Sequence, residues 1–401
     1  MTERDVALHV YRDPVEGFDG FLAYAGTSRP LAAGGFRVQP GLTAEQVVAL
    51  AATMRRKEAV LQLNVDGAKC GIAYDSRAPG KRAAMRRFLH FIAPHLSSRL
   101  SLGPDMGTSF QEIESLAREE GLPSVKSAIA RAQGMSRDEV RRRLSMLEAP
   151  LGPLTLGERR AGHGVAHAAL AAWRRVQTRP PTCVLQGFGT LGRGTAATLL
   201  ELGATITSVA DEHGCAHAPG GLPIERMLAA PPRASVTDCA GPGVERRPRE
   251  AVLTTRADVL VLAGCEDGLP QTLLDRVRTT VIVVGANKGI DEKVAAALHR
   301  RAIVVVPDLV AGSGGSAAMD AMFAPAVTPE PAEVLDRVGL IARTLTEQLL
   351  ERATATGLSP TATAAALADE TSLPDSAPPY GLRTLAPHGS LARTRAESQA
   401  E

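Results

Sequence analysis

The stretch that decides the fold is VLQGFGTLGRGTAATLLELGATITSVAD, residues 184–211. An apolar run leads into three glycines spaced as GxGxxG, and an Ala/Leu-rich segment and a second β-branched run follow. The first glycine permits a tight turn, the second lets a pyrophosphate approach the backbone, and the third lets the helix and strand pack closely. The stretch therefore predicts a strand, a loop, a helix and a strand that bind a dinucleotide, with a purely structural glycine turn as the alternative.

An acid stands where a ribose-binding carboxylate is expected. Asp211 lies nineteen residues beyond Gly192, at the end of the second predicted strand, and favours NAD. The neighbouring Glu212 and His213 leave NADP as the alternative cofactor. The residues predicted to bind the cofactor are Gly187, Phe188, Gly189, Thr190, Leu191, Gly192, Asp211, Ala263 and Asn287.

The sequence around this stretch repeats the same alternation. From 164 to about 310, helical segments separate the β-branched runs TCVLQGFG, ATITSVAD, ADVLVLAG, TTVIVVGAN and AIVVVPD. Near-continuous apolar strands of this kind form a parallel sheet that helices cover on both faces. We therefore expect a doubly wound Rossmann-type α/β domain.

The N-terminal part predicts a second α/β domain. Thr43 and Gln46 form a capping-box pattern ahead of an apolar run, which predicts a helix over 43–58 with Lys57 near its end. The segment AVLQLNVDGAK predicts a strand running into a glycine turn, so Lys69 is expected where strand meets loop. The other expected elements are short strands in 1–40, helices at 81–98 and 110–120, and a strand within 99–109.

These elements give the following domain plan. We expect a substrate-binding domain at 1–130, a linker with a charged helix at 131–160, a dinucleotide-binding domain at 161–325, C-terminal helices returning to the substrate domain at 326–367, and a tail at 368–401. The tail is rich in Pro, Ser and charge with few large apolar groups, and this composition predicts disorder.

Composition excludes several classes of protein. The net charge is +2 and aromatic residues make up 3%, so nucleic acid is not an expected partner. No stretch approaches 18 apolar residues, so we expect no membrane span. The five cysteines are scattered without CxxC pairs and the first residues are charged, which favours a cytoplasmic protein with free thiols.

Lysine is rare in this chain. Only six of the 45 basic residues are Lys, yet Lys57 and Lys69 stand twelve residues apart. A guanidinium stays charged, whereas a buried amine can lose its proton and act as a base. The two lysines are therefore candidates for chemistry, with two surface residues as the alternative.

The order of motifs resembles the glutamate/leucine/phenylalanine/valine dehydrogenase family. The resemblance covers roughly residues 30–120 and 180–320 and rests on GGFRVQP, MRRKEAV, GAKCGI, GPDMGT, QGFGTLG, GAN and VVPDLVAGSGG. It implies a two-domain NAD-dependent homo-oligomer with its active site in the cleft between the domains. It also implies reversible oxidative deamination of an L-amino acid to the 2-oxo acid and ammonia.

The same resemblance suggests roles for five residues. Lys57 would pair with the substrate α-carboxylate, and Gly34 and Gly35 would let the substrate lie against the backbone. Lys69 would activate water and stabilise the carbinolamine, and Asp105 would carry the proton to or from the amino group. A second cation beside Lys69 would help it to act as a base near neutral pH. The alternative for Asp105 is a structural role as the N-cap of the following helix.

Three positions depart from the family pattern. Ala33 stands where the family's glutamate-reading lysine would fall, so we expect a neutral, apolar amino acid as substrate. Gly312 and Ala161 replace an Asn and a Thr that contact the nicotinamide, and Ser313 or His163 are the candidates to substitute for them. These losses keep two alternatives open: a non-catalytic dinucleotide-binding relative, or a reductase of another imine.

His163 and His167 are four residues apart, as in a metal pair on a helix. No acid lies beside them, so we expect a packed helix and no metal.

Overall fold

The computed structural model describes residues 6–232, 234–381, 383–385 and 391–393. It forms two compact units. One contains the residues up to Arg143 and the segment Ala368–Thr384, and the other contains Leu144–Leu367. None of the helices in the described part of the chain has both the length and the apolar character needed to cross a membrane.

The first unit is built on a five-stranded mixed sheet. Its order is β1-β2-β4-β3-β5. β2 is antiparallel to both β1 and β4, whereas β3 is parallel to both of its neighbours, β4 and β5. The strands are β1 (Val6–Arg12), β2 (Asp19–Ala25), β3 (Leu31–Val38), β4 (Val65–Ile72) and β5 (Leu100–Pro104).

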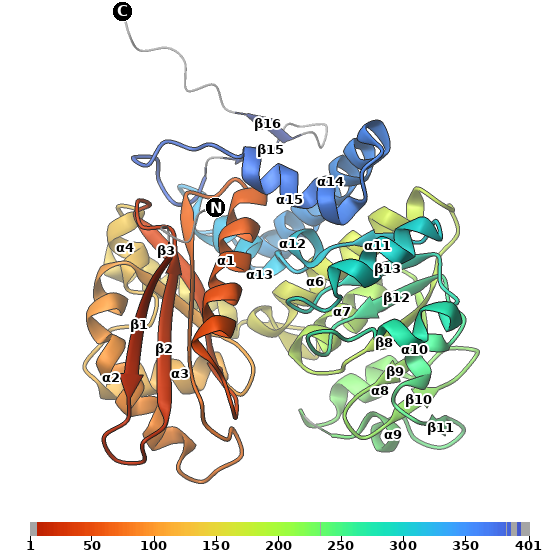
Figure 1. The fold of residues 1–401 in the computed structure, drawn as a ribbon, viewed down its shortest axis with the longest axis horizontal. Coiled ribbons are helices and arrows are strands. Elements are labelled where there is room, and N and C mark those ends of the chain that lie inside the picture. Colours follow the sequence, from red (N-terminus) through yellow and green to blue (C-terminus); the bar gives the residue numbers. More distant parts are fainter. Residues whose placement is uncertain (1–5, 233, 382, 386–390, 394–401) are drawn as a thin grey trace, which may run out of the picture. The chain divides into compact units, whose positions relative to one another are not determined.

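Helices cover both faces of this sheet (Figure 1). One face packs its apolar side chains on α2 (Lys81–Ser98) and α3 (Phe110–Glu119), near α4 (Ala128–Ala132). The other face packs on α1 (Ala44–Val60), which begins with the expected capping box of Thr43 and Gln46. A Cβ at Gly67 would lie 2.1 Å from the Ala51 carbonyl oxygen, so this glycine allows α1 to approach β4 closely.

The second unit contains the predicted parallel sheet. Its order is β11-β10-β9-β8-β12-β13-β14. The five expected strands are present and parallel: β8 (Thr182–Gln186), β9 (Thr205–Ala210), β12 (Val259–Leu262), β13 (Val281–Val284) and β14 (Val304–Val306). The two antiparallel strands at one edge, β10 (Cys215–His217) and β11 (Glu245–Arg247), were not predicted, because three-residue strands carry no readable alternation.

Helices again lie on both faces of this sheet. α6 (Leu156–Arg174), α7 (Thr190–Glu201) and α12 (Asp308–Ala311) cover one face, and α10 (Ala251–Thr254) and α11 (Glu292–Arg300) cover the other. The remaining elements of the unit and of the connection to it are α5 (Arg137–Ser145), η2 (Met146–Glu148), β6 (Pro150–Leu151), β7 (Leu154–Thr155), α8 (Ile224–Ala229), α9 (Val236–Cys239), η3 (Gln271–Arg276) and α13 (Gly314–Phe323).

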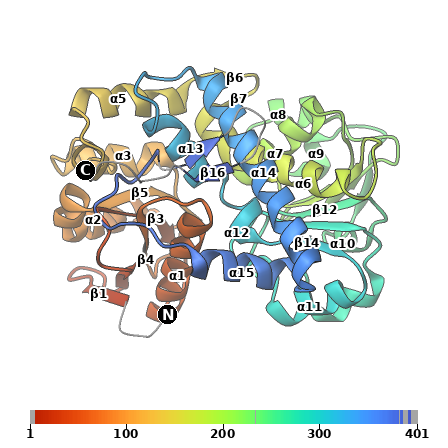
Figure 2. The ribbon, with the colours of Figure 1, turned by 90° about the horizontal axis from the view of Figure 1, so that it is seen from above.

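The C-terminal helices differ from the expectation that 326–367 returns to the first domain. α14 (Pro331–Thr356) packs on α6 and α13 (Figure 2). Its apolar side chains are buried within the second unit. The chain passes to the first unit near Leu367, inside α15 (Pro360–Glu370). Packing of α14 on α6 therefore decides which unit this segment joins.

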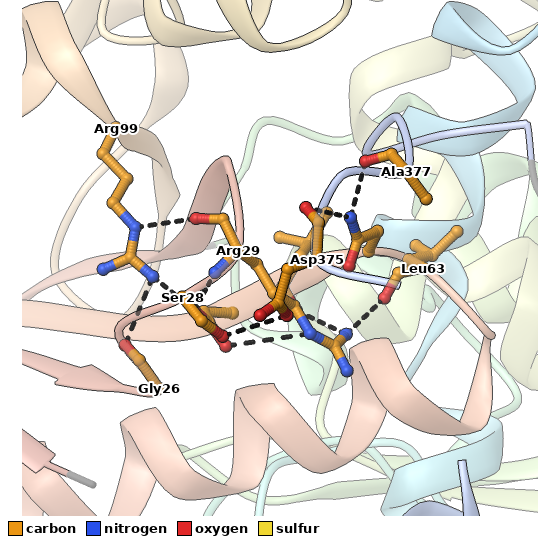
Figure 3. Close-up of polar contacts among 10 residues, drawn as sticks. Gly26, Ser28, Arg29, Leu63, Arg99, Asp375 and Ala377 are labelled. Atoms are coloured by element: carbon orange, nitrogen blue, oxygen red, sulfur yellow. Dashed lines mark hydrogen bonds and ion pairs between the residues drawn. The ribbon is translucent and has the colours of Figure 1, made fainter. Parts of the chain in front are cut away.

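The prediction of disorder from residue 368 is wrong for 368–381. Asp375 accepts a hydrogen bond from Ser28 at 3.2 Å, and the Asn64 amide donates to the Ala377 carbonyl at 2.6 Å (Figure 3). Tyr380 is 2% exposed and exchanges two backbone hydrogen bonds with the side chain of Gln133. Specific contacts thus order a polar segment. Two short strands follow, β15 (Arg383–Leu385) and β16 (Leu391–Arg393), and residues 382, 386–390 and 394–401 lie outside the described residues.

Candidate active site

Lys69 lies in the interior of a buried strand. All eight residues of β4 are buried, Lys69 is 2% exposed, and its backbone is opposite Ala23 of β2. The expectation that Lys69 sits where strand meets loop is therefore wrong, because β4 continues to Ile72. Lys69 shares with Gly67 the sheet face on which α1 packs, since side chains alternate along a strand.

Asp105 follows β5 directly and is fixed by a small turn. Thr108 accepts a hydrogen bond from the Asp105 backbone N–H at 3.0 Å and donates to the Phe36 carbonyl at 2.8 Å. The helix cap of α3 is Ser109, which accepts from the Glu112 N–H at 3.2 Å. Asp105 is therefore not the cap, and its carboxylate is used elsewhere.

The two predicted catalytic residues meet, and an arginine joins them. Lys69 Nζ lies 2.7 Å from Asp105 Oδ2, and Arg37 Nε lies 2.8 Å from the same oxygen. Burial opposes ionisation of this carboxyl, but the charges of Lys69 and Arg37 outweigh burial and hold the pKa of Asp105 well below its usual range. Asp105 is therefore a carboxylate at neutral pH.

Arg37 is the functional candidate that sequence reasoning missed. It lies within GGFRVQP, but arginine is so frequent in this chain that the residue type alone does not mark it. The available signal was the strand period: Gly35 and Arg37 are two residues apart on β3 and point to the same face.

The paired glycines have separate structural reasons. β3 lies between β4 and β5, so the Lys69 ammonium must reach across β3 to contact Asp105. A Cβ at Gly35 would lie 3.2 Å from Lys69 Nζ and 3.0 Å from Asp105 Cβ. A Cβ at Gly34 would lie 1.8 Å from the Ala68 carbonyl oxygen of β4. Gly35 thus leaves room for the charge pair, and Gly34 lets the two strands approach.

Lys57 lies where the sequence predicted it, in the last turn of α1. Lys57 and Lys69 are each 2% exposed, so neither is a surface lysine. The cation that shares the Asp105 oxygen with Lys69 is Arg37 and not Lys57.

The glycine loop has the geometry of a dinucleotide site. Gly187 has φ +102°, and a Cβ there would lie 2.6 Å from the Gly264 Cα. A Cβ at Gly192 would lie 2.0 Å from the Gly187 carbonyl oxygen, so helix α7 and strand β8 are in close contact. A Cβ at Gly189 would meet nothing within 4 Å, and α7 begins there with no side-chain cap. The open space beside uncapped N–H groups fits a pyrophosphate.

The other predicted cofactor residues follow neighbouring parallel strands. Ala263 comes directly after β12, Asn287 comes shortly after β13, and Asp211 follows β9. The carboxyl ends of parallel strands on either side of β8 form the ligand-binding edge of such a sheet. The Asp211 carboxylate accepts backbone hydrogen bonds from His213, Gly214 and Val236 at 2.8, 3.1 and 2.7 Å. Of its four acceptor positions, two are therefore used by its own turn and a third by the first residue of α9.

Ser313, one of the two candidates for replacing the lost nicotinamide contacts, is engaged in the fold. Ser313 is 2% exposed and donates its hydroxyl hydrogen to the Val310 carbonyl at 2.6 Å. Next to Ala161, Arg160 donates to the Gly315 carbonyl at 2.9 Å, and burial lowers the pKa of Arg160 to about 10. Like Arg37, Arg160 is an arginine that the sequence analysis did not single out.

His163 and His167 pack on one another between helices. Their ring centroids are 4.5 Å apart, and His163 Nδ1 lies 3.1 Å from Thr198 Oγ1 of α7. Burial, the adjacent His167 ring and Arg159 lower the pKa of His163 to about 3, and burial with nearby arginine charges lowers that of His167 to about 4. Both imidazoles are therefore neutral at pH 7 and serve the packing of α6. No group of three or more potential metal ligands occurs within the ranges described above.

A dinucleotide loop in one unit and a buried Lys–Asp pair in the other are features of an amino-acid dehydrogenase. The sequence pattern of "Glutamate/Leucine/Phenylalanine/Valine dehydrogenase" matches residues 155–373, and that of "Glu/Leu/Phe/Val dehydrogenase, dimerisation domain" matches residues 2–120. The chain belongs to this family, as the sequence motifs indicated. It is an NAD- or NADP-dependent oxidoreductase that acts on the CH–NH2 group of an amino acid.

Known relatives are named glutamate dehydrogenases. The enzyme of Thermotoga maritima is 28% identical over 311 residues, which are 75% of this chain and 71% of that protein. Glutamate dehydrogenase B of Halobacterium salinarum is 27% identical over 77% of this chain and 71% of that protein. The hetero-hexameric glutamate dehydrogenase of Thermus thermophilus, in a leucine-bound form, has a TM-score of 0.72 at 26% identity and covers 90% of this chain and 86% of that one.

Proposed function

We propose that this enzyme catalyses the reversible oxidative deamination of a neutral L-amino acid to the 2-oxo acid and ammonia. The observation that carries the choice of a neutral side chain is Ala33 on β3, at the position where the family resemblance expects a lysine. Its neighbours in the sheet are Gly67 on β4 and Ser101 on β5, which are also uncharged. This row of the sheet therefore presents no cation of its own to a side-chain carboxylate.

We assign the chemistry to Lys57, Lys69 and Asp105. Lys57 pairs with the substrate α-carboxylate, and Lys69 activates the water that adds to the imino carbon. Asp105 is ionised and 2.7 Å from Lys69, which suits a group that accepts the proton of the substrate ammonium. Lys57 belongs to helix α1, Lys69 to strand β4 and Asp105 to the turn after β5, all within the first unit.

The reaction also needs a hydride acceptor, which is the chemistry that a nicotinamide supplies. We propose that Gly187, Gly189 and Gly192 hold its pyrophosphate at the start of α7, and that the remaining acceptor position of Asp211 takes a ribose hydroxyl. The open space at Gly189 supports this assignment. NAD is the proposed cofactor, with NADP as the alternative.

A second substrate class is favoured by one buried lysine. Lys126 is 5% exposed, and its Nζ lies 3.3 Å from Ser101 Oγ. Ser101 is the β5 residue that pairs with Ala33 of β3. A cation from outside the sheet thus reaches this row. The alternative substrate is therefore an amino acid with an acidic side chain, in agreement with the names of the relatives.

We also propose that the chain forms a homo-oligomer. The match of residues 2–120 to a dimerisation domain supports this, as does the hexameric relative of Thermus thermophilus. Light scattering after gel filtration tests it, and a monomer at micromolar concentration would contradict it.

The test of function is absorbance at 340 nm with NAD and with NADP across a panel of L-amino acids that includes leucine, phenylalanine and glutamate. We expect turnover on a neutral substrate and its loss in Lys69→Ala and Asp105→Asn. Lys81→Ala is the control, because Lys81 pairs with Glu112 in the same unit. Turnover on glutamate alone, abolished by Lys126→Met, would select the acidic alternative. Absence of turnover in both directions with intact dinucleotide binding would select a non-catalytic role.

A further inference from the structure

Two cations of different chemistry share one oxygen atom in the candidate site. Asp105 Oδ2 receives Lys69 Nζ at 2.7 Å and Arg37 Nε at 2.8 Å. Both side chains are almost fully buried, 3% exposed for Lys69 and 4% for Arg37. Within the described part of the chain, the contacts of the Asp105 side chain all end on Oδ2, so Oδ1 is the oxygen left for a ligand.

The two cations respond differently to loss of a proton. A guanidinium does not give up its proton in a protein, whereas an ammonium does. When Lys69 is neutral, Arg37 still pairs with Asp105. Without Arg37, the same step would leave a carboxylate that is 14% exposed with no cationic partner on Oδ2, which is a costly state.

We propose that Arg37 is a positioning residue that keeps Asp105 ion-paired while Lys69 releases its proton to water or to the bound substrate. This inference rests on the proposed role of Lys69 as a base and names the fixed cation on which that role depends. Arg37 also donates from Nη1 to Oε1 of Gln39, directly after β3, at 3.4 Å, and this second contact helps to hold the guanidinium with Nε toward Asp105.

The other charged groups near Lys69 are unchanged in the variants used to test this inference. α1 packs on β4 and carries Arg55, Lys57 and Glu58. Asp66 of β4 lies on the opposite face of the strand and pairs with Arg99. A change at position 37 therefore removes the second cation on Asp105 Oδ2 and leaves these other charged side chains in the sequence.

The first test is the pH dependence of kcat/KM for Arg37→Gln. The limb that reports deprotonation of Lys69 is expected to move to higher pH by about one unit or more, because an opposite or like charge at this distance shifts a titration by roughly 1–3 units. Arg37→Lys restores the charge and is expected to return most of the shift. Gln39→Leu, which removes the contact of Gln39 with the Arg37 guanidinium but keeps Arg37, is expected to shift the limb less in the same direction. Arg12→Gln removes an equal charge from an exposed ion pair of the same unit and is expected to leave the limb unchanged.

The second test does not depend on turnover. The rate of acetylation of Lys69 by acetic anhydride measures its neutral fraction, and peptide mass spectrometry reads it with the other five lysines as internal references. The midpoint of reactivity is expected to rise in Arg37→Gln and to be unchanged in Arg12→Gln. An inactive wild type with this shift would refute the proposed function and leave the role of Arg37 intact. The inference would be overturned if a folded Arg37→Gln protein kept both the wild-type midpoint of Lys69 acetylation and the wild-type pH profile of kcat/KM.

Discussion

Adding one methyl group at Gly35 is expected to disturb the reaction more than the fold. The new Cβ would lie 3.0 Å from Asp105 Cβ, and carbon atoms in contact prefer about 3.5–4.0 Å. It cannot retreat, because the Pro104 carbonyl oxygen is 3.2 Å away on the backbone. Lys69 and Asp105 must therefore move by about half an ångström.

This displacement sets the size of the effect. Misplacing reacting groups by about 1 Å costs on the order of 100-fold in rate, so a shift of half that size predicts a loss of roughly 10- to 100-fold in kcat for Gly35→Ala. That loss corresponds to about 1.4–2.7 kcal/mol of transition-state stabilisation. The unfolding transition is expected to change little, because the atoms that must move belong mainly to side chains.

Two neighbouring glycines serve as comparisons. Gly34→Ala places a Cβ 1.8 Å from a carbonyl oxygen of β4 and is expected to destabilise the first unit strongly. Gly103 of β5 pairs with Gly35, and a Cβ at Gly103 would have one neighbour within 4 Å, the Gly34 carbonyl oxygen at 3.6 Å. Gly103→Ala is therefore expected to have the same urea midpoint as the wild type. Steady-state kinetics and urea unfolding of the three variants make the comparison. A folded Gly35→Ala enzyme with kcat within twofold of the wild type would refute the reasoning.

Three further predictions concern the second unit and the C-terminal segment. Gly192→Ala would place a Cβ 2.0 Å from the Gly187 carbonyl oxygen and is expected to abolish dinucleotide binding. A fluorescence titration measures this, and micromolar affinity of the variant for the dinucleotide would contradict the close packing of loop and helix. The fold lowers the pKa of His163 to about 3 and of His167 to about 4, whereas histidines in the unfolded chain have pKa values of about 6.5. Between about pH 6.5 and pH 4 the unfolded chain therefore binds more protons than the folded protein. The free energy of unfolding is therefore expected to fall as the pH drops from about 6.5 towards 4, and His167→Gln should flatten this dependence in urea titrations at pH 7.5 and 5.0. Tyr380→Ala is expected to lower the free energy of unfolding by about 3 kcal/mol, because the ring is 2% exposed, and an unchanged urea midpoint would show that the segment adds no stability.

The second unit was predictable because its signals are local. The apolar run before Gly187, the glycine spacing and the acid at 211 all lie within one stretch, and each reports a backbone requirement. The helix α1 was equally predictable, since Thr43 and Gln46 mark its start directly. Such features depend on neighbours in sequence and not on the rest of the fold.

What the sequence could not predict depends on contacts between distant segments. The composition of 371–381 favours disorder, and its order is explained by partners far away in sequence, among them Ser28, Asn64 and Gln133. The return of 326–367 to the first domain was expected, yet α14 buries its apolar face on α6. A helix shows in its sequence that one face is apolar, but not which surface will cover that face.

The candidate site shows how one strand can govern a charge pair that belongs to its neighbours. Lys69 and Asp105 come from β4 and from the end of β5, and β3 separates these strands. Their contact crosses the open space over β3 that Gly35 leaves, and in the proposed mechanism Arg37 supplies the fixed cation at its end. If Lys69 is the base that we propose, lysine is required at this position even in a chain that uses arginine almost everywhere, because a guanidinium would keep its proton and leave Asp105 permanently paired with two fixed charges.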